Sequence, residues 1–204
     1  MSKSFFELLK TSDDEEYFKY FTTYLISPII TGIKPSSIIN LTNNRNMLNI
    51  WHEKRTEFLS HLNLEYITIR EKENVEIVLI YNRSNLIEVL KCRKIRALLS
   101  KYGYKNLNDI QSVLLHLSDR FKVESCPHEI GVFLGIPLHD VEDFINCKDK
   151  PCLLCRYWKV YSNLDYSKDI FEKYDLSKKI VTSYLLEGKN LKLLCNNFQR
   201  EIYV

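Results

Sequence analysis

Residues 65–81 read EYITIREKENVEIVLIY, and they set the architecture that we expect for the chain. Two runs rich in Ile, Val and Tyr, at 65–70 and 75–81, flank the polar turn EKEN, a pattern that predicts an antiparallel hairpin. The second run is apolar at consecutive positions rather than at alternate ones. We therefore expect it to be buried on both faces, in the middle of a sheet.

Helices are predicted on both sides of this hairpin, because apolar residues recur there at helical spacing. Upstream we expect a helix that begins after Ser12 and ends at Pro28, a short strand at 36–39 and a helix at about 46–62. Downstream we expect helices at 85–100 and 107–121, a strand at 157–161, and two or three helices from 167 to 194 with Gly188 as a C-cap. Strands are few and do not alternate with helices, so the predicted fold is α+β: a helix-rich single domain, 1–204, around a small, mainly antiparallel sheet.

Composition and charge exclude few function classes. Of the 204 residues 45% are hydrophobic and 27% are charged, and the net charge of +3 is too small to indicate a polyanionic partner by itself. No apolar run approaches the length of a membrane span, and the N-terminus lacks the apolar core of a signal peptide. We expect a cytoplasmic protein without a membrane partner, in which cysteines stay reduced.

The stretch 125–161 holds a helix pair at about 127–146 with the spacing of a helix-turn-helix. Gly131 would allow the two helices to cross closely, and Gly135 is placed to end the first helix. The second helix carries Asp140, Glu142 and Asp143 and no Lys or Arg. Three carboxylates would repel phosphates, so the pair is expected as a packing unit, and sequence-specific DNA binding is disfavoured.

Three segments, GIKP at 32–35, CPHEIGVFLG at 126–135 and CRYWKVY at 155–161, resemble the bacterial domain-of-unknown-function family 3793. The resemblance spans nearly the whole chain. It implies no activity, substrate or cofactor, because the family has none established. In the family the second cysteine before YWKVY is usually followed by Gly, whereas this chain has Arg156, which disfavours a tight metal-binding turn there.

The cysteines of this region form the first candidate site. Its proposed metal ligands are Cys126, His128, Cys147, Cys152 and Cys155. The C-x4-C-x2-C spacing of the last three, with Cys195 as a fourth thiolate, opens like an iron–sulfur site, and the Cys/His combination suits zinc. Two alternatives remain open: a reactive dithiol, and cysteines that are simply buried apolar residues.

His128 and Glu129 are the candidate catalytic residues, because an imidazole and a carboxylate serve as acid and base. Neighbours in a helix do not face each other, so we do not expect them to act as one pair. In the alternative interpretation Glu129 complements a helix dipole and His128 packs or caps.

A basic run forms the second candidate site. It contains no acid between Glu88 and Asp109, and its proposed partner-binding residues are Arg93, Lys94, Arg96, Lys101 and Tyr102. Cations interleaved with Tyr102 and Tyr104 would hold an acidic protein or a nucleic acid. In the alternative interpretation they are the solvated face of an ordinary helix.

No phosphate-binding glycine loop, nucleophile elbow or zinc-protease motif occurs. The sequence therefore leaves two hypotheses and does not decide whether the protein is an enzyme. The first is an accessory protein with a Cys/His metal or thiol site. The second is an interaction module that uses the basic helix around 91–105.

Overall fold

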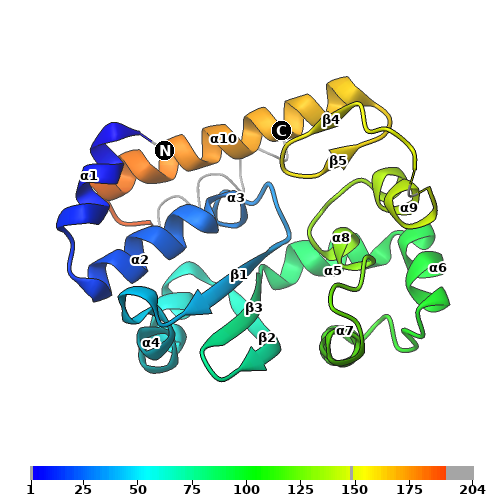
Figure 1. The fold of residues 1–204 in the computed structure, drawn as a ribbon, viewed down its shortest axis with the longest axis horizontal. Coiled ribbons are helices and arrows are strands. Elements are labelled where there is room, and N and C mark those ends of the chain that lie inside the picture. The colour runs from blue at the N-terminus through cyan, green and yellow to red at the C-terminus, as the bar shows by residue number, and fades with distance from the viewer. Residues whose placement is uncertain (1, 148, 192–204) are drawn as a thin grey trace.

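A computed structural model of the protein describes residues 2–147 and 149–191 (Figure 1). The helices of this part run over Lys3–Thr11 (α1), Asp14–Leu25 (α2), Ser27–Ile30 (α3), Met47–Leu62 (α4), Arg83–Lys91 (α5), Arg93–Lys101 (α6), Ile110–Val123 (α7), Ile130–Phe133 (α8), Leu138–Asn146 (α9) and Leu164–Leu186 (α10), with a 3₁₀ turn at Asn44–Asn46. The strands run over Ser36–Thr42 (β1), Glu65–Lys72 (β2), Val75–Tyr81 (β3), Leu154–Cys155 (β4) and Lys159–Val160 (β5). The fold is α+β, as predicted. No helix within the described ranges is long and apolar enough to cross a bilayer.

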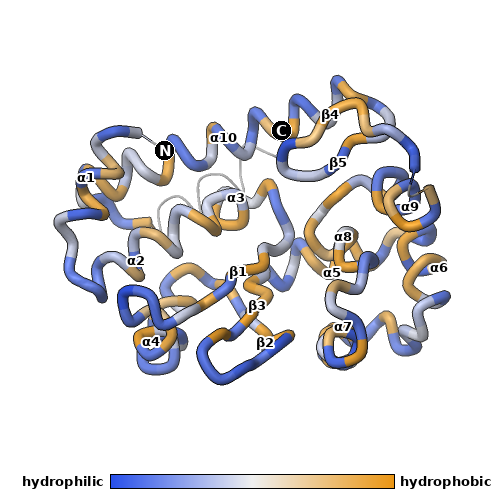
Figure 2. The backbone as a smooth tube through the Cα atoms, viewed as in Figure 1, coloured by the Kyte–Doolittle hydropathy of each residue, from blue (hydrophilic) through white to orange (hydrophobic). Residues whose placement is uncertain are grey.

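The main sheet has the order β1-β3-β2, and β3 is antiparallel to both of its neighbours. Successive side chains alternate between the faces of a strand. In β3, Val78 and Ile80 therefore lie on one face and Leu79 and Tyr81 on the other, and all four are at most 2% exposed. Figure 2 shows the hydrophilic turn that joins β2 to the hydrophobic strand β3. The predicted hairpin and the central position of its second strand are confirmed.

Different helices cover the two faces of this sheet. The face of Val78 and Ile80 packs against α1, α2, α4 and α10, where Trp51 of α4 is fully buried with its ring 5.0 Å from that of Tyr66 in β2. The face of Leu79 packs against helices α5 to α9. A third, smaller core joins the β4–β5 hairpin to α10 through Trp158, Val160, Phe171 and Tyr174.

Two predicted helical regions differ from the structure. The single helix expected at 85–100 is two helices, because Cys92 adopts an extended conformation between α5 and α6. The two or three helices expected after 167 are, within the described residues, the one helix α10, and residues 192–194 lie outside the described part. No Gly or Pro occurs between 164 and 187 to interrupt α10, and Gly188 follows its cap with a positive φ, as predicted.

The predicted strand at 157–161 is shorter than expected and includes only Lys159 and Val160. The helix pair at 127–146 is present as α8, a single turn, and α9. A Cβ on Gly131 would lie 2.7 Å from Cγ2 of Val141, so this glycine permits the close crossing that its position indicates. The α8–α9 unit therefore packs as the sequence suggests.

Gly135 is required for two separate reasons. Its φ of +75° is a left-handed conformation that residues with a Cβ adopt only at a cost. A Cβ there would also lie 2.7 Å from Cδ of Pro35 in the loop between α3 and β1. Segments 126–135 and 32–35, which are far apart in the sequence, therefore touch at this glycine.

We expect Gly135→Ala to lower the free energy of unfolding much more than Gly188→Ala. Gly188 also has a positive φ, +64°, but a Cβ there would meet nothing within 4 Å. The control should lose about 1 kcal/mol, the conformational cost alone. Gly135→Ala should lose roughly 1–3 kcal/mol more, because Pro35 must move. Urea unfolding of both variants measures the difference, and equal losses would contradict the tight contact.

Candidate functional site

The structure does not assemble the predicted metal ligands. In residues 2–147 and 149–191, no three side chains of His, Cys, Asp or Glu are grouped so that they could hold a metal ion. His128 instead contacts Phe144 of α9, edge to face with ring centroids 4.9 Å apart. The set of Cys126, His128, Cys147, Cys152 and Cys155 therefore remains a prediction that the geometry does not support, and Cys195 lies outside the described residues.

The alternative interpretation of these cysteines, as buried apolar residues, is wrong for the described part of the chain. The thiols of Cys92, Cys126, Cys147 and Cys155 are exposed, and that of Cys152 is half-buried. The hairpin is so short, with two residues in each strand, that it leaves Cys155 at its edge rather than in the core. The thiols are free, and solvent reaches them.

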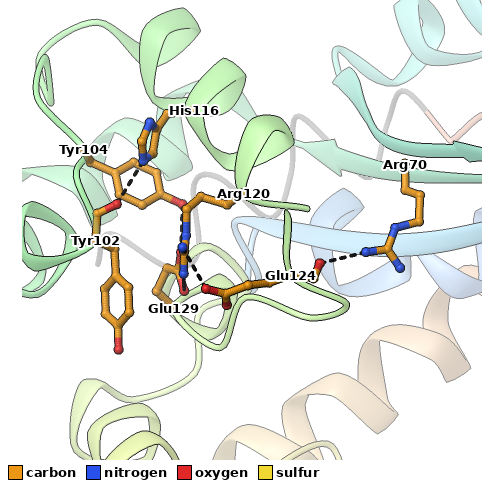
Figure 3. A network of polar contacts seen from close by, with 7 residues as sticks. All are labelled: Arg70, Tyr102, Tyr104, His116, Arg120, Glu124 and Glu129. Atoms are coloured by element: carbon orange, nitrogen blue, oxygen red, sulfur yellow. Dashed lines mark hydrogen bonds and ion pairs between the residues drawn. The ribbon is translucent and has the colours of Figure 1, made fainter. Parts of the chain in front are cut away.

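Glu129 is fully buried, and its partner comes from α7. Arg120 donates from Nε to Oε1 of Glu129 at 2.7 Å, and the Tyr104 hydroxyl donates to the same oxygen at 3.4 Å (Figure 3). Burial, reinforced by the Glu129 carboxylate, raises the pKa of Tyr104, so its hydroxyl stays protonated. His128 is exposed whereas Glu129 is buried, in agreement with the rule that neighbours in a helix do not face each other, and a catalytic role for either residue stays a prediction.

The same network fixes the end of α7. Arg120 also lies 2.8 Å from the carboxylate of Glu124, and Arg70 of β2 donates to the backbone carbonyl of Glu124 at 2.8 Å (Figure 3). On the other side, His116 donates from Nε2 to the carbonyl of Tyr102 at 3.0 Å. The network joins β2, α7, the loop after α6 and the start of α8. Glu129, at the start of α8, thus closes an ion pair with Arg120.

Asp140, one of the three carboxylates expected to repel phosphates, is turned inward. It is 1% exposed and accepts hydrogen bonds from Nε1 of Trp158 and from the backbone N–H of Tyr161, both at 2.8 Å. The backbone N–H of Ser162 lies 3.3 Å from Oδ1 of Asp140, the oxygen that also accepts from Tyr161. This carboxylate therefore fastens the β4–β5 hairpin to α9.

The basic run lies on α6 and the loop that follows it. Arg93, Lys94, Lys101 and Lys105 are exposed. Tyr104, by contrast, is 2% exposed and packs against His116, with ring centroids 4.3 Å apart. Tyr104 therefore offers no ring to a partner. Of the two tyrosines expected among the cations, only Tyr102 is left.

The remaining members of the predicted partner-binding set have structural contacts. Arg96 donates from Nη1 to Oδ1 of Asn108 at 3.0 Å and so ties α6 to the next loop. Tyr102 is half-buried, and Cζ of the Arg120 guanidinium lies 5.3 Å from the centroid of its ring. Of the predicted set, Arg93, Lys94 and Lys101 remain as surface cations that form no ion pair with a carboxylate in the described part of the chain.

Sequence reasoning missed a buried carboxylate in the sheet. Glu76 of β3 is 2% exposed, accepts a hydrogen bond from the Thr68 hydroxyl, and has its other oxygen 3.3 Å from Nε2 of His52 in α4. Arg55 donates to Nδ1 of the same imidazole at 2.8 Å. The sequence contains a signal for this site, because Glu76 is a single acid within an otherwise apolar strand that is buried on both faces. Such an acid must have a polar partner.

A cavity of about 670 Å³ lies between α2, α4 and the residues after α10. Its wall includes Glu15 and Lys19 of α2, Lys54 and Glu57 of α4, and Lys189. Both cations and carboxylates line it, so its charge favours no one class of ligand.

Comparison with known proteins identifies a family but no activity. A family model described as Protein of unknown function (DUF3793) matches residues 22–195. No curated protein and no solved structure matches the chain significantly. The match covers the sheet, the helix pair and the β4–β5 hairpin.

We expect Glu129→Gln to lower the free energy of unfolding by about 3–5 kcal/mol, because it leaves the Arg120 guanidinium, 19% exposed, without its buried partner. The matched control is Glu124→Gln, which removes the exposed partner of the same arginine and should cost about 0–1 kcal/mol. Chemical denaturation followed by circular dichroism measures both variants. Similar losses in the two would show that burial does not distinguish these pairs.

Proposed function

Because the chain belongs to the family described as Protein of unknown function (DUF3793), its function has to be inferred from its own surfaces, and we propose that it is an interaction module that binds an acidic partner protein through α6. The observation that carries this proposal is a group of exposed cations without a carboxylate partner. We call Arg93, Lys94, Lys101 and Lys105 the basic surface.

Three cations of the basic surface lie on α6, and Lys105 lies in the loop that follows it. Lys94 and Lys101 are seven residues apart, which is close to two turns, and Arg93 lies beside Lys94. None of the four forms an ion pair with a carboxylate of the described residues, and no acid occurs in the sequence from 89 to 108. The buried side of α6 consists of Leu98 and Leu99, so the helix packs through its apolar side and leaves its charges to solvent.

The charges at the start of α6 are opposite in sign to those that stabilise the N-terminus of a helix. Acids stabilise the first turn of a helix, where unpaired N–H groups point outward. In α2, Asp13 caps the helix and three acids follow it. In α6, Arg93 and Lys94 occupy the first turn instead, and no side chain caps it. A partner's carboxylates would supply the negative charge that this turn lacks.

A protein partner fits this surface better than a single-stranded nucleic acid. Proteins that hold single strands stack bases on exposed aromatic rings. Here Tyr104 is buried and Tyr102 is half-buried beside Arg120, so the cations have no free ring among them. Carboxylates of an acidic segment require only the charges.

We expect the double variant Arg93→Glu, Lys94→Glu to lose binding to a poly-glutamate peptide and at the same time to unfold at a higher temperature. The stability should rise by up to about 1 kcal/mol, because acids replace cations at the helix N-terminus. Fluorescence anisotropy with labelled poly-glutamate at several salt concentrations, together with thermal unfolding, measures both effects.

The matched control is Lys72→Glu with Lys168→Glu, which changes the net charge equally at two exposed lysines away from α6. It should keep the binding. An equal loss of binding in both double variants would show that the net charge alone, and not the position of the cations on α6, determines the interaction. A labelled single-stranded RNA serves as the alternative probe. If it binds more tightly than poly-glutamate, in a salt-dependent way, and if this binding is also lost in the α6 variant, the partner is a nucleic acid and not an acidic protein.

We propose thiol chemistry at Cys126, Cys152 and Cys155 as a second candidate function, supported by the exposure of Cys126 and Cys155 and the only partial burial of Cys152. A reactive thiol must be accessible, and these cysteines meet that condition, whereas no described group of side chains supports the metal set. The zinc or iron–sulfur interpretation thus has weaker support than the thiol interpretation.

We expect the exposed thiols to be alkylated by iodoacetamide in the native, reduced protein, and mass spectrometry should locate the modified residues. Thiols that react only after denaturation would remove this candidate. Elemental analysis of anaerobically purified protein is the companion measurement, and stoichiometric zinc or iron would restore the metal interpretation.

A further inference from the structure

The loop 32–35, between α3 and β1, is held rigidly by its backbone. The N–H of Lys34 donates to the carbonyl of Pro28 at 2.9 Å, and the N–H of Asn82 donates to the carbonyl of Pro35 at 2.9 Å. Asn85 of α5 donates from its side chain to the carbonyl of Gly32 at 3.1 Å. The backbone of Lys34 is therefore fixed from both sides, and its side chain reaches Tyr174 of α10.

The ammonium group of Lys34 is placed against an aromatic ring and not against a carboxylate. Its Nζ lies 5.8 Å from the centroid of the Tyr174 ring, and within the described residues it has no ion pair with an acid. Lys34 is only partly exposed, so its charge has lost much of its hydration. A ring face compensates a desolvated cation only in part.

A second lysine lies on the neighbouring ring. Nζ of Lys178 lies 4.7 Å from the centroid of Tyr157 and 5.4 Å from that of Tyr24, and it donates to the Tyr157 hydroxyl at 3.0 Å. The rings of Tyr157 and Tyr174 meet edge to face, with centroids 5.1 Å apart. The two ammonium groups thus lie over two rings that touch.

The acid beside this pair already has partners. Asp175 accepts a hydrogen bond from the Tyr157 hydroxyl and another from Arg156, each at 2.6 Å. Arg156 pairs with Asp175, and the charge of Lys178 acts on the same carboxylate, whereas Lys34 lies near Lys178. The group therefore contains three cations and one carboxylate, an excess of two positive charges.

We propose that Lys34 and Lys178 bind the phosphate group of a small phosphorylated molecule, over the touching rings of Tyr157 and Tyr174. A phosphate monoester carries nearly two negative charges at neutral pH, which matches the excess of the group. Each lysine offers N–H donors that the described contacts do not use, since Lys178 spends one on Tyr157 and Lys34 none. The exposed ring of Tyr157 would pack against the body of the ligand.

The lowered pKa of Lys34 is a second observation in favour of this site, beside its geometry. Burial, and then the nearby charge of Lys178, lowers the pKa of Lys34 to about 8 from its ordinary value. A bound phosphate would remove that cost by supplying the opposite charge. Because only protonated Lys34 attracts the anion, binding should weaken as the pH rises through 8. The other titratable groups of the site face the same anion: Tyr24, Tyr157, Tyr174, Asp175 and Lys178, beside the permanently charged Arg156.

We expect phenyl phosphate to bind saturably in calorimetric titrations at constant ionic strength, and Lys34→Met and Lys178→Met each to weaken it at least about tenfold, since a charged hydrogen bond is lost. The matched control is Lys179→Met, the exposed neighbour of Lys178 on α10, which should leave the affinity unchanged. Inorganic phosphate as a second probe separates recognition of the phosphate from contacts with the ring.

Two further measurements distinguish a ligand site from a structural role. The affinity of the wild type should fall between pH 7 and pH 9, where phenyl phosphate remains a dianion, and this fall should be smaller in Lys34→Met. Thermal unfolding at pH 7 should show Lys34→Met to be at least as stable as the wild type. A lysine with a lowered pKa destabilises the fold below that pKa, and the penalty is relieved as the pH rises from about 8 toward the unfolded value.

The proposal is overturned if no saturable binding occurs, if both lysine variants bind as the wild type does, or if Lys179→Met loses as much affinity as they do. If Lys34→Met does not fold, as judged by circular dichroism, Lys178→Met and the pH profile of the wild type decide the matter. This site lies away from α6, so either proposal can fail without the other.

Discussion

Burial of strand β3 on both of its faces is the constraint on which the other elements depend. Val78, Leu79 and Ile80 are fully buried at successive positions, and each contributes roughly 1.5–3 kcal/mol when it is removed from water. That burial requires two separate layers of helices, one on each face of the sheet. The N-terminal helices and α10 supply the first layer, and helices α5 to α9 supply the second (Figure 1).

Buried acids attach the outer elements to this core. Glu129 accepts from Arg120 and fixes the start of α8, and Asp140 accepts from Trp158 and the backbone and fixes the β4–β5 hairpin. Both acids belong to the stretch 125–161, where the sequence suggested chemistry. A buried carboxylate with its acceptor sites occupied by donors is a structural anchor, because leaving it unpaired would cost several kcal/mol, about 3–5. The polar residues of this stretch therefore serve mainly to hold the fold together.

The features that point to function are cations that the fold does not neutralise. The basic surface of α6 places positive charge where a helix favours acids, and Lys34 places an ammonium over a ring without a carboxylate. Each arrangement lowers the stability of the isolated protein, and each would be relieved by an anion. Natural proteins tend to accept such local penalties at the sites where they act.

The sequence by itself determined the α+β class, the hairpin 65–81 with its doubly buried strand, the glycines of the helix pair and most helix positions. These follow from local periodicity and from the steric needs of single residues. It did not reveal the break at Cys92 or the continuity of α10, because packing overrides weak local preferences. It also did not reveal that the side chains of Glu129, Asp140 and Tyr104 are buried. Only the tertiary structure decided that Lys34 meets Tyr174 and Lys178, since residues about 140 positions apart become neighbours through the packing of α10 against α3. Contacts of that kind leave no periodic trace in the chain, so a sequence pattern cannot predict them.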